Sequence, residues 1–268
     1  MTKRVAKGHV FRIVLLLLSG TGLPTATRAA RPSFLYTYSP HREPAGEAEI
    51  ETWITARVGK QDPTGTRWEP RAEFEYAVTR RLSTAAYLNF VKESNHPLKL
   101  ESASVEWILG LSKPGVIAGD PALYLETTVA ASEFELEPKL LLGQEHGPWI
   151  AALNLIGEFE FRRNDDELLP SGNVLHRAAA GELSAGIAYE AARGLSLGIE
   201  SRYRSEHPNF GAQAVALFSI GPNASLQLGK SRFGVAWLPR VWGHASTYGG
   251  DLDDFERSQV RAVLGLEL

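Results

Sequence analysis

Apolar and charged side chains alternate along two adjacent stretches near the middle of the chain, residues 133–142 and 149–162. In the first stretch Phe134 and Leu136 share one parity, whereas glutamates occupy the other. The second stretch repeats the pattern after the turn-forming residues 145–148. Because successive side chains of a strand point to opposite faces, the pattern predicts an antiparallel hairpin with one apolar and one charged face.

The same alternation recurs along most of the chain and predicts twelve strands, separated by links rich in Pro, Gly and polar residues. The other strands are expected at residues 49–59, 67–79, 83–91, up to 111, 123–129, 182–190, 195–204, up to 228, 232–241, and up to the last residue, 268. Short links alternate with long polar ones, apart from the short link near 130–132 and the long one at 113–121. The longest break, 163–177, is predicted to be a surface loop.

Strand length and charge distribution decide between two folds that share this pattern. Each strand is about as long as a tilted membrane-crossing strand, roughly 9–11 residues, and the apolar faces are nearly free of charge. We therefore predict an all-β fold, a transmembrane antiparallel up-and-down β-barrel of about twelve strands. A soluble secreted β-sandwich or closed barrel, with its apolar face inward, is the alternative fold.

The first thirty residues have the layout of a secretory signal peptide. A basic start that includes Lys3 and Arg4 precedes a short apolar run, and small residues offer cleavage after Ala29 or Ala30. We expect residues 1–30 to be a signal peptide and residues 31–268 to form one outer-membrane β-barrel domain in a Gram-negative envelope. Residues 31–46, rich in Pro and Tyr, are expected to lead into the first strand.

Several segments carry a resemblance to a known group of proteins: Tyr124-Leu-Glu126, the run from Glu133 to Leu142, Asn154, Glu158-Phe-Glu160 and Ile220-Gly221-Pro222. The chain resembles a poorly characterised family of bacterial outer-membrane barrels described as transporters or porin-like proteins. The resemblance covers most of the mature chain and implies no catalytic role. Barrels of this kind usually end in an aromatic residue, whereas this chain ends in Leu268.

The charged faces of the predicted strands would line the barrel lumen. The expected lining residues are Glu51, Arg57, Glu69, Arg71, Glu73, Glu75, Glu106, Glu126, Glu133, Glu135, Glu137, Lys139, Asn154, Glu158, Glu160, Glu200, Arg202 and Arg204. These charges either pair across strands and fill the lumen or line a narrow polar path. Since carboxylates outnumber bases in this set, we expect a mild preference for cations or basic solutes if the lumen conducts.

Composition offers little support for other functions. Lys and Arg are spread singly and the net charge is -3, so we expect no nucleic-acid partner. The absence of cysteine excludes disulfides and thiolate metal sites. The histidines at 96, 146, 176, 207 and 244 are expected in loops or turns, without a serine at strand spacing and without metal-ligand spacing. We therefore expect no catalytic residues, no metal and no cofactor.

These observations predict that the protein is not an enzyme. We expect a narrow porin-like channel or transporter that passes small solutes or ions through a charge-lined lumen. A non-conducting structural or interaction barrel with a side-chain-filled lumen is the alternative within the same fold. Expected partners are outer-membrane lipids, lipopolysaccharide and the outer-membrane assembly machinery.

Overall fold

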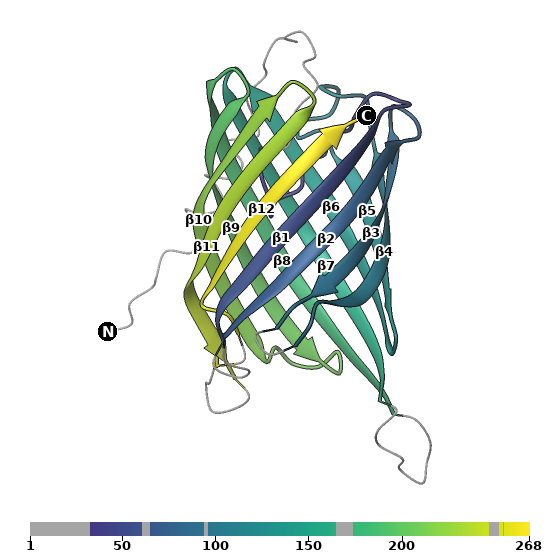
Figure 1. Ribbon diagram of the computed structural model, residues 1–268, viewed down its shortest axis with the longest axis vertical. Helices are drawn as coiled ribbons and strands as arrows, with labels where there is room; N and C mark the ends of the chain where they lie inside the picture. The colour runs from purple at the N-terminus through teal and green to yellow at the C-terminus, as the bar shows by residue number, and fades with distance from the viewer. Residues whose placement is uncertain (1–32, 61–64, 94–95, 165–173, 247–251, 254) are drawn as a thin grey trace, which may run out of the picture.

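The computed structural model describes residues 33–60, 65–93, 96–164, 174–246, 252–253 and 255–268. Twelve antiparallel strands follow one another along the chain and incline to a common axis (Figure 1). They are β1 (Ala48–Lys60), β2 (Gly65–Ala77), β3 (Leu82–Val91), β4 (Lys99–Gly110), β5 (Ala122–Ala130), β6 (Glu133–His146), β7 (Trp149–Asn164), β8 (Val174–Ala192), β9 (Leu195–Pro208), β10 (Val215–Leu228), β11 (Ser231–Ala245) and β12 (Ser258–Glu267).

The strands form a single closed barrel in which each pairs with its sequence neighbours and β1 pairs with β12. The closing pair is continuous, from Glu49 opposite Glu267 to Val58 opposite Ser258. The all-β barrel prediction and the strand number are therefore confirmed. The alternative of a β-sandwich is wrong, because closure of β1 on β12 leaves no second sheet for the first to pack against.

The predicted boundaries of several strands are wrong: β6 runs to His146 and β11 to Ala245, and the largest difference is at the longest predicted break. Val174 to Arg177 were assigned to a surface loop, yet β8 begins at Val174 and pairs with β7 as far as Asn164. This end of the β7–β8 hairpin lacks the apolar alternation that revealed the other strands, so backbone pairing alone defines it. The predicted break is correspondingly shorter at both ends, since Arg163 and Asn164 belong to β7.

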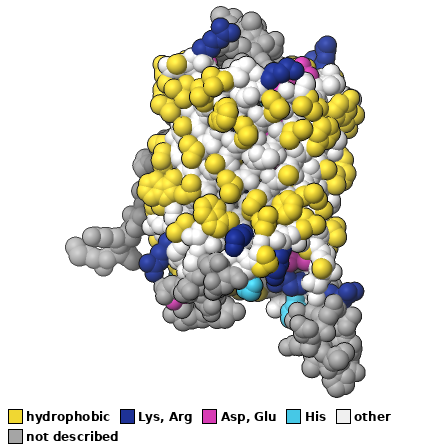
Figure 2. Space-filling view, in the orientation of Figure 1, with side chains coloured by type: hydrophobic (Ala, Val, Ile, Leu, Met, Phe, Trp, Pro, Cys, Tyr) yellow, Lys and Arg dark blue, Asp and Glu magenta, His cyan; other side chains and the backbone are white. Residues whose placement is uncertain are grey.

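The outer surface of the barrel is apolar. Outward side chains such as Phe74, Leu155 and Ile199 are 47%, 49% and 52% exposed, which would be costly on a water-soluble protein. Apolar side chains spread over the middle of the wall in Figure 2, whereas Lys and Arg gather near its two ends. The fold is thus that of a transmembrane barrel, with an apolar belt between polar rims. Within the described residues, no helix is long and apolar enough to cross a membrane.

Residues 33–43 lie inside the barrel, and we call them the luminal segment. Ser33 to Thr37 are each at most 5% exposed, and a turn at residues 44–47 joins the segment to β1. The turn is at the end of the barrel where β1 begins and β12 ends, which is uppermost in Figure 1 and is called the upper end here. The predicted lead-in is therefore an internal element that occupies the lumen.

Candidate functional site: the barrel lumen and its internal segment

A glutamate of the barrel wall binds three consecutive amides of the luminal segment. Glu200, on β9, has no solvent exposure. Its carboxylate accepts hydrogen bonds from the backbone N–H of Leu35 at 2.9 Å, Tyr36 at 2.7 Å and Thr37 at 2.8 Å. Bonds to an ionised acceptor are about twice as strong as neutral ones, and three converging donors compensate the burial of the charge. Glu200 is therefore the principal polar anchor of the segment.

Three further wall side chains engage the backbone on either side of this anchor. Asn154, on β7, accepts from the N–H of Tyr38 at 2.7 Å and donates to its carbonyl at 2.8 Å. Asn223, on β10, donates to the carbonyl of Ser33 at 2.6 Å, and Arg261, on β12, donates to that of Leu35 at 2.8 Å. The wall thus satisfies main-chain groups that could not otherwise be buried away from water.

Two tyrosines of the segment lie against cations of the wall. The Tyr36 ring is 4.1 Å from the guanidinium of Arg261 and 5.3 Å from that of Arg202. The Tyr38 ring is 3.9 Å from Lys139 Nζ and 5.1 Å from the ring of Tyr124. Cation–π contacts strengthen when the partners are desolvated, and Tyr36 and Lys139 are both at most 5% exposed.

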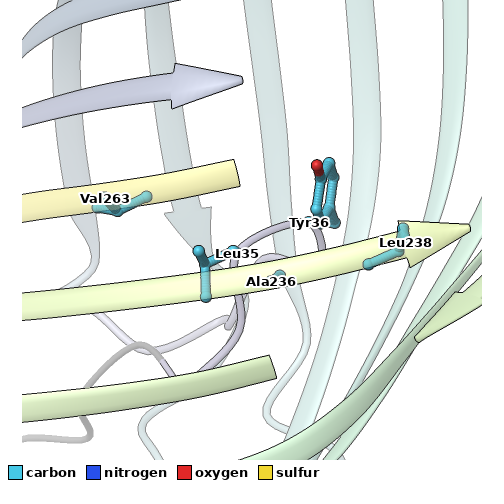
Figure 3. Close-up of a cluster of buried hydrophobic side chains, with 5 residues drawn as sticks. All are labelled: Leu35, Tyr36, Ala236, Leu238 and Val263. Carbon is cyan, nitrogen blue, oxygen red and sulfur yellow. The ribbon is translucent and has the colours of Figure 1, made fainter. Parts of the chain in front are cut away.

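Small residues of the wall make room for the segment. A Cβ atom at Gly186, on β8, would lie 2.6 Å from the ring of Phe34, and one at Gly143, on β6, would lie 2.5 Å from Pro40. Leu35 packs over Gly234 and beside Ala236, and Figure 3 shows Leu35 and Tyr36 next to the inner face of β11. The wall and the segment are therefore complementary in shape as well as in hydrogen bonding.

Ion pairs join side chains of different strands on the inner face of the wall, towards the end of the barrel away from the turn at 44–47. Arg57 pairs with Glu69 at 2.7 Å, and Arg204 pairs with Glu158 at 2.7 Å. The side chains of these two arginines remain 31% and 28% exposed, so solvent reaches them from the lower end of the barrel. Near the segment the ion pairs are shielded from solvent, since the side chains of Lys139 and Glu51 are only 3% and 7% exposed.

An acidic cavity of about 100 Å³ lies beside the luminal segment. Glu49, Glu73, Glu75 and Glu106 line it, together with Arg232, which pairs with Glu51 and Glu49. At the mouth of the barrel, burial raises the pKa of Glu43 to about 7, and the neighbouring carboxylates of Glu267, Glu49, Glu47 and Glu75 act in the same direction.

All eighteen side chains expected to line the lumen belong to the inward parity of their strands, opposite the exposed apolar side chains. The ion pairs of this set include Arg57–Glu69, Arg71–Glu126, Arg204–Glu158, Lys139–Glu137, Arg202–Glu182, Glu51–Arg232, and Arg162 with both Glu133 and Glu160.

The rest of the set make polar contacts, border the acidic cavity or join a carboxylate cluster. Glu106 and Glu126 both lie within hydrogen-bond distance of the Tyr124 hydroxyl, and Arg71 also donates to Asn89. Glu200 and Asn154 hold the segment, Glu73 and Glu75 border the acidic cavity, and Glu135 approaches Glu137 and Glu158.

Three of these carboxylates come close together. Within the described residues, ligand atoms of Glu135, Glu137 and Glu158 all lie within 4.8 Å of one another. Glu137 bonds Lys139 at 2.6 Å and Glu158 bonds Arg204 at 2.7 Å, so two of the three already have a cationic partner. Glu137 and Glu158 thus belong to the wall ion-pair network, and Glu135 lies beside them.

The expectation that the histidines lie in loops or turns is wrong for most of them. His146, His176, His207 and His244 belong to β6, β8, β9 and β11, and His207 Nε2 lies 3.4 Å from the hydroxyl of Ser205 on the same strand. The Ser205 hydroxyl also approaches the Gly181 carbonyl at 3.3 Å, and Ser205 is paired with β8 and β10 on its two sides. Acyl transfer needs backbone N–H groups that point at the oxyanion, whereas the N–H groups around Ser205 take part in the pairing of β9 with β8 and β10.

Several residues of the lumen were missed by the sequence pattern. Glu182 and Arg232 complete ion pairs, and Asn223 and the luminal segment were not assigned to the site. One signal was available: the inward positions of β8 from Ala180 to Ala188 are mostly Ala, Gly or Ser. Small inward side chains on a barrel strand indicate that something else fills the space opposite them.

The fold and the apolar outer belt together define the class: a transmembrane β-barrel with a charged lumen. A family model described as a family of unknown function (DUF6662) matches residues 27–107, which include the luminal segment, β1 to β3 and most of β4. No curated protein sequence matches the chain.

Two solved structures are similar to the whole barrel. An outer membrane channel from Pseudomonas putida F1 superposes with a TM-score of 0.57 at 11% identity, over 85% of this chain and 97% of that one. The NanC porin gives a TM-score of 0.51 at 9% identity, over 82% of this chain and 98% of the porin. At these identities the likeness is one of fold, and the expected resemblance to outer-membrane barrels is confirmed at that level.

Proposed function

We propose that the protein is an outer-membrane channel for small solutes or ions whose lumen is closed at rest by the luminal segment. The closing element is then a piece of main chain rather than the charge lattice of the wall. The main support for this proposal is that the solvent exposure of the charged wall side chains changes along the lumen. Arg57 and Arg204 remain partly solvated, whereas the wall charges beside the segment, such as Lys139, are buried.

The way the segment is held supports reversible closure. All the contacts described above are hydrogen bonds, cation–π contacts and apolar packing, so withdrawal of the segment breaks no covalent bond. The closed barrel keeps its own ladder from β1 round to β12 when the segment leaves. Withdrawal exposes Glu200, Asn154 and Arg261, which then line a polar path.

Location and partners follow from the same proposal. Export by a signal peptide at residues 1–30 lies outside the described residues and is proposed from the sequence. The apolar belt supports contact with outer-membrane lipids, and the polar rims support contact with lipopolysaccharide and with the assembly machinery that inserts such barrels. Because carboxylates outnumber bases among the expected lining residues, we propose that the open lumen prefers cations.

A non-conducting barrel is the second candidate. The close fit of Phe34 and Pro40 against glycines of the wall supports it, since a permanently filled lumen would be packed in the same way. In that case the segment would be a structural core, and the apolar contacts of Leu35 and Tyr36 with β11 and β12 would serve stability alone.

Single-channel recording of the mature chain in lipid bilayers separates the two candidates. We expect brief or rare openings from the intact protein and long, stable openings from a variant that lacks residues 33–43. Reversal potentials in a salt gradient then give the ion preference of the open state. A folded deletion variant that stays silent would eliminate the channel.

A disulfide lock provides the matched test in the full chain. The hydroxyl oxygens of Ser33 and Ser196 are 3.4 Å apart, so paired cysteines there are within bonding reach. The chain has no native cysteine to compete. We expect the oxidised Ser33→Cys/Ser196→Cys protein to remain closed and to regain its channel openings on reduction. The openings of the Ser33→Cys single variant should be the same under oxidising and reducing conditions.

A further inference from the structure

We propose that the lumen is a binding site for short peptides, and that the luminal segment is its tethered ligand. Peptides with aromatic side chains at alternate positions are then the class of solute that the open channel recognises. This inference rests on the proposed function only for access, since recognition depends on the wall groups themselves.

The polar contacts of the wall with residues 33–38 go overwhelmingly to main chain. Glu200 takes three consecutive N–H groups, and Asn154 takes both the N–H and the carbonyl of one residue. Asn223 and Arg261 each take a carbonyl. Because every peptide presents these groups, the wall would bind a different sequence with the same hydrogen bonds.

Side-chain selectivity comes from three places on the wall. Phe34, Tyr36 and Tyr38 are two residues apart in sequence, and each ring enters a different environment. Phe34 lies over Gly186, Tyr36 lies against Arg202 and Arg261, and Tyr38 lies against Lys139 and Tyr124. A surface of glycine leaves room for a flat aromatic ring, and a cation attracts the ring face through the quadrupole of the ring.

The charges around the site narrow the ligand further. Glu73, Glu75 and Glu106 border the cavity next to the segment, and only Arg232 among its lining cations is deeply buried. A carboxylate on the part of the peptide that faces this cavity would be repelled by these glutamates, whereas a basic group there would be attracted. At positions that face the cavity, we therefore expect neutral or basic side chains to bind in preference to acidic ones.

Competition in the intact chain tests the inference. The probe is the acetylated and amidated peptide Ser-Phe-Leu-Tyr-Thr-Tyr-Ser-Pro, the sequence of residues 33–40. Because a tethered ligand acts at millimolar effective concentration, the free peptide is used at about 5 mM. We expect it to slow disulfide formation in the Ser33→Cys/Ser196→Cys protein at least threefold, by occupying the wall in place of the segment.

Two matched peptides separate specific binding from crowding of the lumen. N-methylation at the position of Tyr36 removes a donor to Glu200, and the expected loss of affinity is about tenfold or more. Alanine at the three aromatic positions tests the side-chain pockets in the same way. Equal effects of the parent and N-methylated peptides, or no effect of either, would overturn the proposal.

The variant that lacks residues 33–43 provides the second readout, by titration calorimetry and by block of its current. Current without peptide binding leaves the channel proposal intact and refutes the peptide site. Peptide binding to a silent, folded barrel refutes the channel and supports the site. If that variant does not fold, the competition in the intact chain decides alone.

Discussion

Replacement of Glu200 by glutamine should release the luminal segment while leaving the strand pairing of the barrel, including β1 with β12, intact. Glutamine keeps the size of the side chain, and its oxygen can retain the bonds from Tyr36 and Thr37, which both reach the same carboxylate oxygen. Its NH2 group then faces the N–H of Leu35, so a donor meets a donor where a bond of 2.9 Å existed.

The size of the effect follows from the bonds. A hydrogen bond to a charged group contributes about 1.5–3 kcal/mol, and the two retained bonds weaken when their acceptor becomes neutral. The neutral amide costs less to bury than a carboxylate, which offsets part of this loss. We expect about 2–3 kcal/mol less stability for the docked segment, which is roughly a 30- to 140-fold shift towards release.

Amide hydrogen exchange read by mass spectrometry measures this shift directly. Peptic fragments covering residues 33–38 should exchange faster by roughly the same factor, since exchange follows the opening equilibrium. The control is Glu206→Gln on the same strand, because Glu206 bonds Arg204 and not the segment. Unchanged exchange at 33–38, or an equal change in the control, would refute the assignment of Glu200 as the anchor.

Three further perturbations have defined outcomes. Gly186→Ala should loosen the segment by about 1–3 kcal/mol through its clash with Phe34, and Phe34→Ala should abolish that effect in a double-mutant cycle of exchange rates. Docking of the segment should become less favourable as pH rises from 4.5 to about 7, because burial raises the pKa of Glu43, so the docked state holds a proton that the released state loses. The open time of the channel should therefore increase with pH over this range, and Glu43→Gln should flatten that dependence. Ile199→Arg on the apolar belt should lower the free energy of unfolding in lipid vesicles by about 2–4 kcal/mol in urea titrations, whereas Leu228→Arg at a strand end should cost about 0–1 kcal/mol; equal costs would contradict a membrane-embedded belt.

The period-two pattern was sufficient to predict the barrel and its strand number. Phe134 and Glu135 fall on opposite faces because strand geometry leaves no other choice, and the same holds wherever apolar and charged residues alternate. The pattern failed from Val174 to Arg177, where pairing continues without alternation. Those residues are held by backbone hydrogen bonds to β7, which no side-chain pattern records.

The luminal segment could not be predicted in this way. Its aromatic residues, Phe34, Tyr36 and Tyr38, alternate with Leu35 and Thr37 and not with charged residues, so the stretch would suit an exposed loop equally well. Their position depends on tertiary contacts with Glu200 and Asn154, which the same pattern had assigned to the lumen for a different reason. Tertiary contacts override local preference at this site, as is common where a structure performs a function.

The position of the segment also bears on how the barrel assembles. Leu35 bonds residues that are 165 and 226 positions away in the chain, on β9 and β12. Contacts of such long range form late, because the entropy of closing so large a loop must first be overcome. The segment is joined to the first strand and grips the last, so it braces the seam between them from inside. Its docking therefore reports that the seam has closed, and it should appear as the final kinetic phase of refolding.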